Sequence, residues 1–186
     1  MSTTKMTVVR PGILTTVQDW PGRIGYWKVG VPPSGPMDDL SFRLGNVALG
    51  NPEGAAGLES AMSGPALTFD ADTYVCVTGA DVPVTIDGHS AEQWRPLLVP
   101  AGATLDVGTS NGAGLRVYVT IQGSMEIDDY LGSAATFTLG KFGGLRGGTL
   151  TEGDIIEIVG AADPSNLRSI PMEHRPVLTS KWEIAV

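Results

Sequence analysis

The chain has 186 residues, of which 42% are apolar and 17% charged, enough for one domain with a buried core or for two small domains. Its formal net charge is −8 and its twelve lysines and arginines are scattered, which argues against nucleic acid and anionic membranes as partners. No apolar stretch approaches the roughly eighteen residues that span a bilayer, and the N-terminal sequence MSTTKMTVV lacks the apolar core of a signal peptide. We therefore expect a globular, cytoplasmic protein.

The first element in chain order that the sequence predicts is a single helix over residues 36–49. Gly50 and Pro52 would end it, because glycine is favoured just after a helix and proline cannot continue one. A helix in a globular protein buries one apolar face. Residues at helical spacing that would form this face are Met37, Leu40, Leu44, Val47 and Ala48.

The loop before this helix, GVPPSGPMDD, is rich in proline and glycine and should be ordered, because proline restricts the unfolded chain. Pro36 suits the first helical position, and Ser34 or Gly35 can cap the helix. Asp38 in the first turn would complement the positive end of the helix dipole. A second interpretation stays open, because backbone N–H groups at a helix N-terminus also bind anions.

Beyond the helix, six short runs rich in valine, isoleucine and threonine predict β-strands, and turn sequences such as Asp-Gly and Asn-Gly separate several of them. Many short strands with few helical patterns are typical of a β-barrel or sandwich. The predicted strands cover residues 74–78, 82–86, 97–99, 103–107, 115–121 and 155–159.

Cys76, the one cysteine, lies inside the first of these runs. It cannot form an internal disulfide, and we expect a buried, unreactive thiol. Cys76, His89 and His174 are not at the spacings of metal ligands, so we expect no metal site.

The stretch LGKFGGLRGG, residues 139–148, is rich in glycine, and two interpretations of it stay open. The glycines can make the tight turns that a barrel needs. They can also bring the backbone close to a ligand, with Lys141 as a positive charge for a bound carboxylate. The order of the residues excludes a phosphate-binding P-loop.

Several motifs occur in a characteristic order: TTVQDWPGRIGYW, GVPPSGPMD and GNPEGAAGLE within residues 10–59, YLGSAATFTLGKFGG at residues 130–144, and LTEGDII at residues 150–156. Together they resemble the carboxyltransferase domain of biotin-dependent urea carboxylase, a family also called allophanate hydrolase subunit 2 or KipA-like. WPGRIGYW is closer to the urea carboxylase branch than to the 5-oxoprolinase branch. The resemblance implies a mainly β, cyclophilin-like barrel with one prominent helix, in agreement with the predicted strands.

The resemblance also implies a reaction in which carboxybiotin gives its carboxyl group to a nitrogen of urea, or of a urea-like molecule such as guanidine. Biotin would be carried by another domain or chain. Such a site must hold both partners, stabilise negative charge and move a proton. The expected catalytic residues are Ser34 with the N–H groups after it as donors, Asp38 as the residue that handles urea or its proton, and Lys141 as a counter-charge.

Further residues are expected to bind urea or biotin: Asn46, as an amide partner, with Gly35, Gly143 and Gly144. Each candidate also has a structural interpretation. Ser34 and Asp38 can simply cap the helix, Asn46 can satisfy buried backbone groups, and Lys141 can be solvated. For Asp19 and Arg23 in the TTVQDWPGR motif, an ion pair that shapes the loop is favoured over catalysis.

Members of the family continue beyond KWEIAV into a second barrel-like half. The resemblance therefore implies a half-domain at residues 1–160 and an extended connector at residues 161–186, which should pack poorly because it has three prolines and no periodicity. The family usually has arginine at three positions that hold Gln122, Ala134 and Gly148 here. The implied partners are the second half, an allophanate hydrolase subunit 1 (KipI-like) protein, biotin carboxylase and the biotin carrier.

Two alternatives to the urea carboxylase interpretation stay open. A KipA-like protein can act by binding a partner without any chemistry, and the three missing arginines favour this alternative. A component of a 5-oxoprolinase complex is the other. The retained GVPPSGPMD motif favours the enzyme component.

Overall fold

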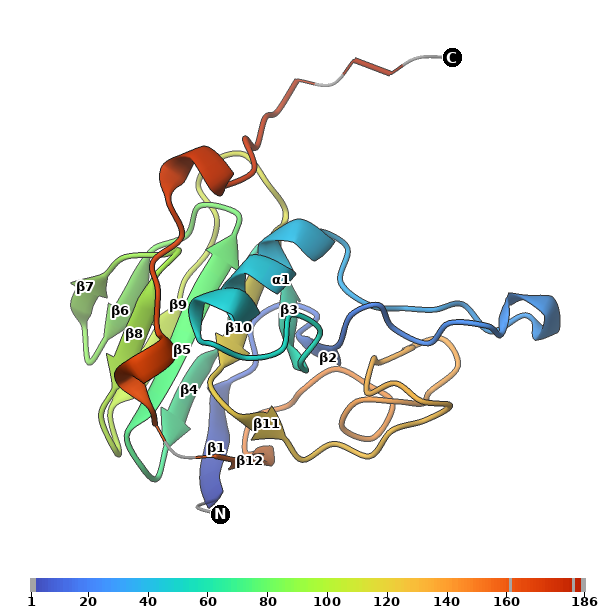
Figure 1. Cartoon of the computed structure of the whole chain (residues 1–186), viewed down its shortest axis with the longest axis horizontal. Helices are drawn as coiled ribbons and strands as arrows, with labels where there is room; N and C mark the ends of the chain where they lie inside the picture. The colour runs from blue at the N-terminus through green and yellow to red at the C-terminus, as the bar shows by residue number, and fades with distance from the viewer. Residues whose placement is uncertain (1–2, 161, 182, 185–186) are drawn as a thin grey trace.

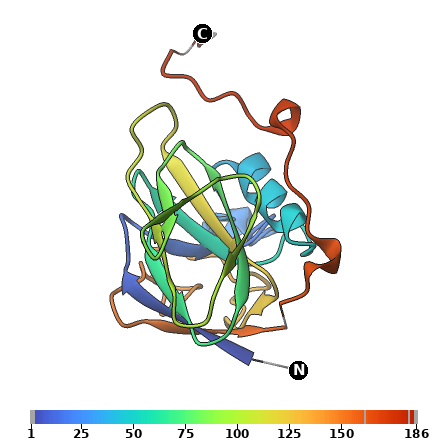
Figure 2. The same ribbon diagram turned by 90° about the vertical axis from the view of Figure 1, so that its left-hand side faces the viewer.

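The computed structural model describes residues 3–160, 162–181 and 183–184. They form a mainly β structure in which two antiparallel sheets enclose one core (Figures 1 and 2). The seven-stranded sheet has the order β11-β12-β1-β4-β9-β6-β7, and the five-stranded sheet has the order β2-β3-β10-β5-β8. The mainly β, barrel-like fold that the sequence predicts is thereby confirmed.

All six predicted strands are present, as β5, β6, β8, β9, β10 and β12, and the described part of the chain contains six further strands that were not predicted. The strands are β1 (Thr3–Arg10), β2 (Thr16–Gln18), β3 (Gly57–Ala61), β4 (Ala66–Phe69), β5 (Thr73–Gly79), β6 (Val84–Ile86), β7 (His89–Ala91), β8 (Pro96–Val99), β9 (Thr104–Val107), β10 (Arg116–Ile121), β11 (Ser124–Met125) and β12 (Ile155–Val159).

The burial of the strand side chains shows where the core lies, and β12 is an example. Its side chains alternate, with Ile156 and Ile158 buried and Ile155 and Glu157 exposed, as in a strand with one face in solvent. The central strands β5 and β10 are buried on both faces instead, because the core covers one face and helix α1 (Asp39–Ala48) covers the other. Cys76 of β5 is buried as predicted, and burial raises the pKa of its thiol to about 12.

Helix α1 begins at Asp39 and not at residue 36 as predicted, and its cap is Asp38 and not Ser34 or Gly35. The Asp38 carboxylate accepts hydrogen bonds from the N–H and hydroxyl groups of Ser41. The helix ends at Ala48, close to the predicted end. Its first turn is displaced because the Met37 and Asp38 N–H groups are bonded to side chains of the sheet.

The predicted apolar face of the helix is wrong except at Ala48, which is buried, because Leu40 is 45% exposed and Leu44 and Val47 are only half-buried. The sheet under the helix presents threonine and tyrosine side chains. Small and polar residues of the helix therefore face the sheet and allow the helix to pack close to it. A Cβ atom on Gly45 would lie 2.9 Å from the Thr120 hydroxyl oxygen. The buried residues of α1 are Ser41, Phe42, Gly45, Asn46 and Ala48.

Residues 162–175 pass along α1 and the end of the five-stranded sheet (Figures 1 and 2). The Arg168 N–H donates to the Ala48 carbonyl at 2.9 Å, and the Ile170 N–H donates to the Trp94 carbonyl at 2.9 Å. The Ile170 side chain is buried. The prediction that the whole segment packs poorly is therefore wrong for this stretch, which finds partners on the helix and beside it.

Two long irregular segments, residues 19–38 and 128–148, extend from the same side of the barrel (Figure 1). We call them the lateral loops. The first carries the short 3₁₀ helix η1 (Trp27–Val29), and two further 3₁₀ helices, η2 (Pro164–Asn166) and η3 (Met172–His174), lie in the C-terminal segment. Among the described residues, no helix has the length and apolar character needed to cross a membrane.

Candidate functional site

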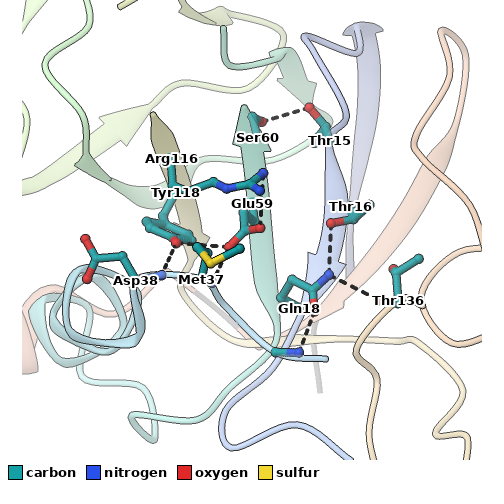
Figure 3. A network of polar contacts seen from close by, with 11 residues as sticks. Thr15, Thr16, Gln18, Met37, Asp38, Glu59, Ser60, Arg116, Tyr118 and Thr136 are labelled. Atoms are coloured by element: carbon teal, nitrogen blue, oxygen red, sulfur yellow. Dashed lines mark hydrogen bonds and ion pairs between the residues drawn. The ribbon is translucent and has the colours of Figure 1, made fainter. Parts of the chain in front are cut away.

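The loop that precedes α1 is fixed to the sheet by three buried polar side chains (Figure 3). The Gln18 side-chain carbonyl accepts from the Gly35 N–H at 3.0 Å. The Glu59 carboxylate accepts from the Met37 N–H at 2.7 Å, and the Tyr118 hydroxyl accepts from the Asp38 N–H at 2.7 Å. The proline-rich loop is therefore ordered by specific bonds to the barrel, in addition to its own stiffness.

These bonds bear on the predicted use of the helix N-terminus. The N–H groups after Ser34 were expected to be free donors for a bound anion or oxyanion. In the structure, those of Gly35, Met37 and Asp38 each donate to a side chain of the sheet. A carboxylate of the protein itself thus occupies the place that an external anion would take. The geometry does not support these three donors as an oxyanion site.

Glu59, Tyr118 and Arg116 form one connected polar cluster on strands β3 and β10 (Figure 3). The Tyr118 hydroxyl donates to Glu59 Oε2 at 2.9 Å, and Arg116 Nη1 lies 3.6 Å from Glu59 Oε1. Burial raises the pKa of the Tyr118 hydroxyl far above its ordinary value, and the negative charge of Glu59 raises it further. Tyr118 is therefore a neutral hydrogen-bond donor at every physiological pH.

Asp38 lies at the junction of helix α1 with the first lateral loop, beside a pocket of about 540 Å³. The pocket is also lined by Met37, residues 112–116 and residues 178–180. Its apolar lining includes Met37, Leu115 and Leu178, while Asp38 and Arg116 supply its charged groups. Capping of the helix uses part of the hydrogen-bonding capacity of the Asp38 carboxylate, which accepts two hydrogen bonds from Ser41. A carboxylate has capacity for about four, so Asp38 can still accept from a molecule in the pocket.

Asn46 is fully buried in α1 and its amide is already bonded within the protein. Its NH₂ group donates to the carbonyls of Ala55 at 2.8 Å and Glu53 at 3.4 Å, and its side-chain oxygen accepts from Asn51 at 3.1 Å. The arrangement corresponds to the structural interpretation, in which Asn46 satisfies the backbone of the turn after the helix. The structure gives no free amide for a substrate here.

Gly143 and Gly144 bring one part of the second lateral loop against another. A Cβ atom on Gly143 would lie 2.0 Å from the Ala135 carbonyl oxygen, and one on Gly144 would lie 2.0 Å from the Thr136 hydroxyl oxygen. Both glycines have positive φ angles. Packing within the loop therefore accounts for both, while Lys141 in the same turn is exposed and has a φ of 56°.

The predicted ion pair between Asp19 and Arg23 does not form, because both side chains bond to the second lateral loop instead. The Arg23 guanidinium is 1% exposed and donates to the carbonyls of Tyr130, Ser133 and Ala135, the last at 2.8 Å. Asp19 accepts from the Ser133 hydroxyl and from the Ala134 N–H. These contacts join the two lateral loops into one unit.

The two loops that carry the predicted catalytic residues, residues 30–38 and residues 140–144, are thus on the same side of the barrel (Figure 1). The first packs on residues 18–23, since the Arg23 N–H donates to the Pro33 carbonyl at 2.7 Å, and the second packs on Arg23 itself. The pocket beside Asp38 is lined by residues 112–116 and 178–180, and Lys141 is not among its lining residues. A single pocket that contains both Asp38 and Lys141 stays a prediction.

Glu59, Tyr118 and Arg116 are not among the residues that the sequence predicts for the site. A signal for them exists, because Glu59 is a charged residue in a short run that is otherwise apolar or small, and it ends the GNPEGAAGLE motif. A carboxylate inside a buried strand needs partners, which suggests a polar network. Within the ranges that the structure describes, no group of three or more acidic, histidine or cysteine side chains is arranged to hold a metal ion.

The sequence is also similar to those of known proteins. The family model described as "Carboxyltransferase domain, subdomain A and B" matches residues 29–186. Urea amidolyase of Saccharomyces cerevisiae is 38% identical over 189 residues, which cover 98% of this chain and 10% of that protein. A 5-oxoprolinase subunit of Haemophilus influenzae is 32% identical over 142 residues, which cover 76% of this chain and 45% of that protein.

The fold is similar to solved structures as well. The crystal structure of the Kluyveromyces lactis urea amidolyase matches with a TM-score of 0.86 at 37% identity, over 95% of this chain and 11% of that one. The K. lactis urea carboxylase structure matches with the same TM-score over 16% of its chain. This chain therefore spans a small part of the yeast relatives that it matches, and under half of the H. influenzae one.

Proposed function

The chain belongs to the family of carboxyltransferase domains with subdomains A and B, and on this premise we propose that it is the carboxyltransferase component of a biotin-dependent urea carboxylase. The proposed reaction moves the carboxyl group of carboxybiotin to a nitrogen of urea, or of a urea-like molecule such as guanidine. The similarity to proteins named urea amidolyase and urea carboxylase supports urea as the acceptor.

The observation that carries the proposal is the position of Asp38 on the rim of the pocket of about 540 Å³, with Arg116 also in its lining. Pockets of roughly 300 to 1,000 Å³ accommodate small-molecule ligands. Apolar walls with two charged groups fit a ligand that has a hydrocarbon ring and polar urea-like groups. We propose that Asp38 and Arg116 would contact the polar groups and that Met37, Leu115 and Leu178 would contact the ring.

The chemistry defines what Asp38 would do. Biotin, when carboxylated on its carrier, supplies an activated carboxyl group. A new C–N bond would form to urea while the bond between the carboxyl carbon and the biotin nitrogen breaks, and the proton lost by the attacking nitrogen would end on the biotin nitrogen that leaves. A carboxylate such as Asp38 can accept a hydrogen bond from urea, orient its nitrogen and receive that proton. Ser34 as a donor, Lys141 as a counter-charge, and Gly143 and Gly144 as backbone contacts to biotin are further parts of the proposal, whereas the Gly35 N–H is already bonded to Gln18.

The experiment combines this chain with the biotin carboxylase, the biotin carrier and the rest of the carboxyltransferase, and measures urea-dependent ATP hydrolysis. Asp38→Asn and Lys141→Ala should each lower kcat/KM for urea by about a hundredfold or more, as expected for loss of a proton-transfer or charge-stabilising group. Asp39→Asn is the matched control, because Asp39 is exposed and pairs with Arg43 on the surface of the helix. Full activity of both variants would show that these residues are wrongly assigned, and no turnover with urea or guanidine would refute the reaction.

A second candidate is a role in a 5-oxoprolinase complex or as a KipA-like binding protein. The observation in its favour is the similarity to the H. influenzae protein, which is named as a 5-oxoprolinase component. Affinity capture with the tagged chain separates the candidates. Co-purification of a biotin carboxylase supports the first proposal, whereas capture of another 5-oxoprolinase component or of a KipI-like protein without biotin carboxylase supports the second.

The proposed function includes a domain arrangement in which residues 1–160 form a half-domain and residues 161–186 lead toward the second half. Large apolar side chains of this segment are exposed, with Met172 at 78%, Val177 at 93% and Ile184 at 79%. Such side chains gain from burial against a partner. Co-expression of the second half should protect amides of residues 172–181 from hydrogen exchange, and unchanged exchange would refute the arrangement.

A further inference from the structure

Glu59 and Tyr118 lie directly opposite each other on the paired strands β3 and β10. Both are buried, and both side chains point to the loop that precedes α1 (Figure 3). Glu59 accepts from the Met37 N–H at 2.7 Å, and Tyr118 accepts from the Asp38 N–H at 2.7 Å. Two consecutive backbone groups are thus held by two neighbouring side chains that are themselves joined by a 2.9 Å hydrogen bond.

A buried carboxylate is costly unless its oxygens are bonded, so a carboxylate at this position needs an explanation. Glu59 Oε2 accepts two hydrogen bonds, and Arg116 lies 3.6 Å from Oε1. The same Arg116 lines the pocket beside Asp38. Glu59 and Tyr118 therefore contact both charged residues of the proposed site, Arg116 through its guanidinium and Asp38 through its backbone N–H.

The position of the Asp38 carboxylate follows from these contacts. Its backbone N–H is fixed by Tyr118, and its side chain is fixed by Ser41 in the first turn of α1. The Phe42 ring of the same helix packs edge-on against the Tyr118 ring, with centroids 5.7 Å apart. Tyr118 thus contacts the element that carries Asp38 at two points, through its hydroxyl and through its ring.

We propose that Glu59 and Tyr118 are positioning residues for the proposed reaction, which hold the Met37–Asp38 backbone so that the Asp38 carboxylate faces the pocket. This inference rests on the proposed function. Neither residue needs to touch a substrate for this role. Because misplacement of a reacting group by about 1 Å can cost roughly a hundredfold in rate, the loss of one of these bonds should be visible in kinetics.

The first measurement is independent of activity and follows amide hydrogen exchange of residues 35–42 in the isolated chain. Tyr118→Phe removes the acceptor of the Asp38 N–H but keeps the ring, so exchange there should accelerate by about tenfold or more if the bond is worth about 1.4 kcal/mol. Tyr74→Phe is the matched control, because Tyr74 lies on the adjacent strand β5 and packs against the separate apolar cluster around Trp94. Unchanged exchange in Tyr118→Phe would overturn the proposal.

The second measurement tests whether Tyr118 acts through Asp38, in the assembled carboxylase. Tyr118→Phe should lower kcat/KM for urea by about tenfold in the wild-type background and by less than about twofold in the Asp38→Asn background, because residues that act as one unit are not additive. A merely structural role would give the same loss in both backgrounds, and that result would overturn the proposal.

Glu59 is tested by a conservative and a non-conservative change. Glu59→Gln keeps an oxygen that can accept from the Met37 N–H, whereas Glu59→Leu removes it, so the Gln variant should retain most of the loop protection that the Leu variant loses. Glu157→Gln on strand β12 is the exposed control. Equal loss in the Gln and Leu variants would overturn the role of this bond. If the wild-type assembly shows no urea-dependent turnover, the proposed function fails, while the exchange measurement still decides whether the pair holds the loop.

Discussion

The barrel and the lateral loops are stabilised by different interactions. The barrel encloses one continuous cluster of buried apolar side chains that comes from nearly every strand. The lateral loops, residues 19–38 and 128–148, bury polar groups instead, including Gln18 at their base, Arg23 and Ser133, each bonded to backbone atoms or to other side chains. Burial of apolar area is not directional, whereas these hydrogen bonds are.

This difference has a consequence for how each part tolerates change. An apolar core loses stability in proportion to the volume removed, and the whole barrel shares the loss. A buried guanidinium that donates to several carbonyls stabilises one loop by itself, because its removal leaves those carbonyls without hydrogen-bond donors. Perturbations of the barrel should therefore be global, and perturbations of the lateral loops should be local.

The largest effect on global stability is expected in the core of the barrel. Leu67 on β4 is fully buried, so Leu67→Ala should lower the free energy of unfolding by about 2 to 5 kcal/mol. Leu98→Ala on β8 is the control, because Leu98 is 43% exposed and its loss should cost well under half as much. Thermal and chemical unfolding measure both. An equal loss of unfolding free energy in the two variants would contradict the assignment of Leu67 to the core.

A smaller global effect but a large local one is expected at Arg23. Arg23→Met leaves the carbonyls of Tyr130, Ser133 and Ala135 without this donor and should cost about 2 to 3 kcal/mol. Hydrogen exchange of residues 130–144 should accelerate while that of the barrel strands does not. Arg95→Met is the control, since Arg95 is exposed and pairs with Glu92 at the surface. Uniform acceleration over the barrel would remove the distinction between the two regions.

The smallest effect depends on pH and concerns the junction of the second lateral loop with β12. Burial of the Asp154 carboxyl favours a higher pKa, but hydrogen bonds from the Thr151 N–H, the Arg146 guanidinium and the Thr151 hydroxyl together lower the pKa below its ordinary value of 3.8. A lowered pKa stabilises the folded state above pH 3.8, and this contribution is lost as the pH falls through the folded-state value.

The measurement compares the unfolding free energies of the wild type and Asp154→Asn as a function of pH. The wild type should be more stable by about 1 kcal/mol at neutral pH, a modest value because the Arg146 side chain is 58% exposed. The difference should shrink below about pH 4, where the carboxyl becomes protonated. Glu152→Gln, at an exposed neighbour, should show no such dependence. A difference that is constant with pH would contradict the role of the charge.

The sequence was sufficient to predict the strands whose side chains alternate or are continuously apolar, such as β5, β10 and β12. It did not reveal β3, because the sequence GLESA places a glutamate and a serine in a buried strand. The start of α1 was misplaced for a related reason. The Met37 and Asp38 N–H groups bond to Glu59 and Tyr118, which are distant in sequence, and local capping rules do not include such contacts.

The site was predictable to a similar extent. The motif containing Asp38 was recognised, and Asp38 does line a pocket. Asn46, Gly143 and Gly144 were also singled out, but the structure accounts for them by bonds and close contacts within the protein. The Asp19–Arg23 pair was expected from proximity in sequence, whereas both residues have better partners in residues 130–135. Non-local partners therefore explain why the predicted ion pair is wrong, while the binding roles of Gly143 and Gly144 stay predictions.

The glycine-rich turn has a consequence for anyone who builds a variant library. A Cβ atom at Gly140, Gly143, Gly144 or Gly147 would come within 2.4 Å of another atom, whereas one at Gly148 would meet nothing within 4 Å. Selection for folded protein should deplete substitutions at the first four positions and tolerate them at the fifth. A side chain can therefore begin at position 148 without a close contact to its Cβ atom, which makes this position the first choice for introducing new side chains into the turn.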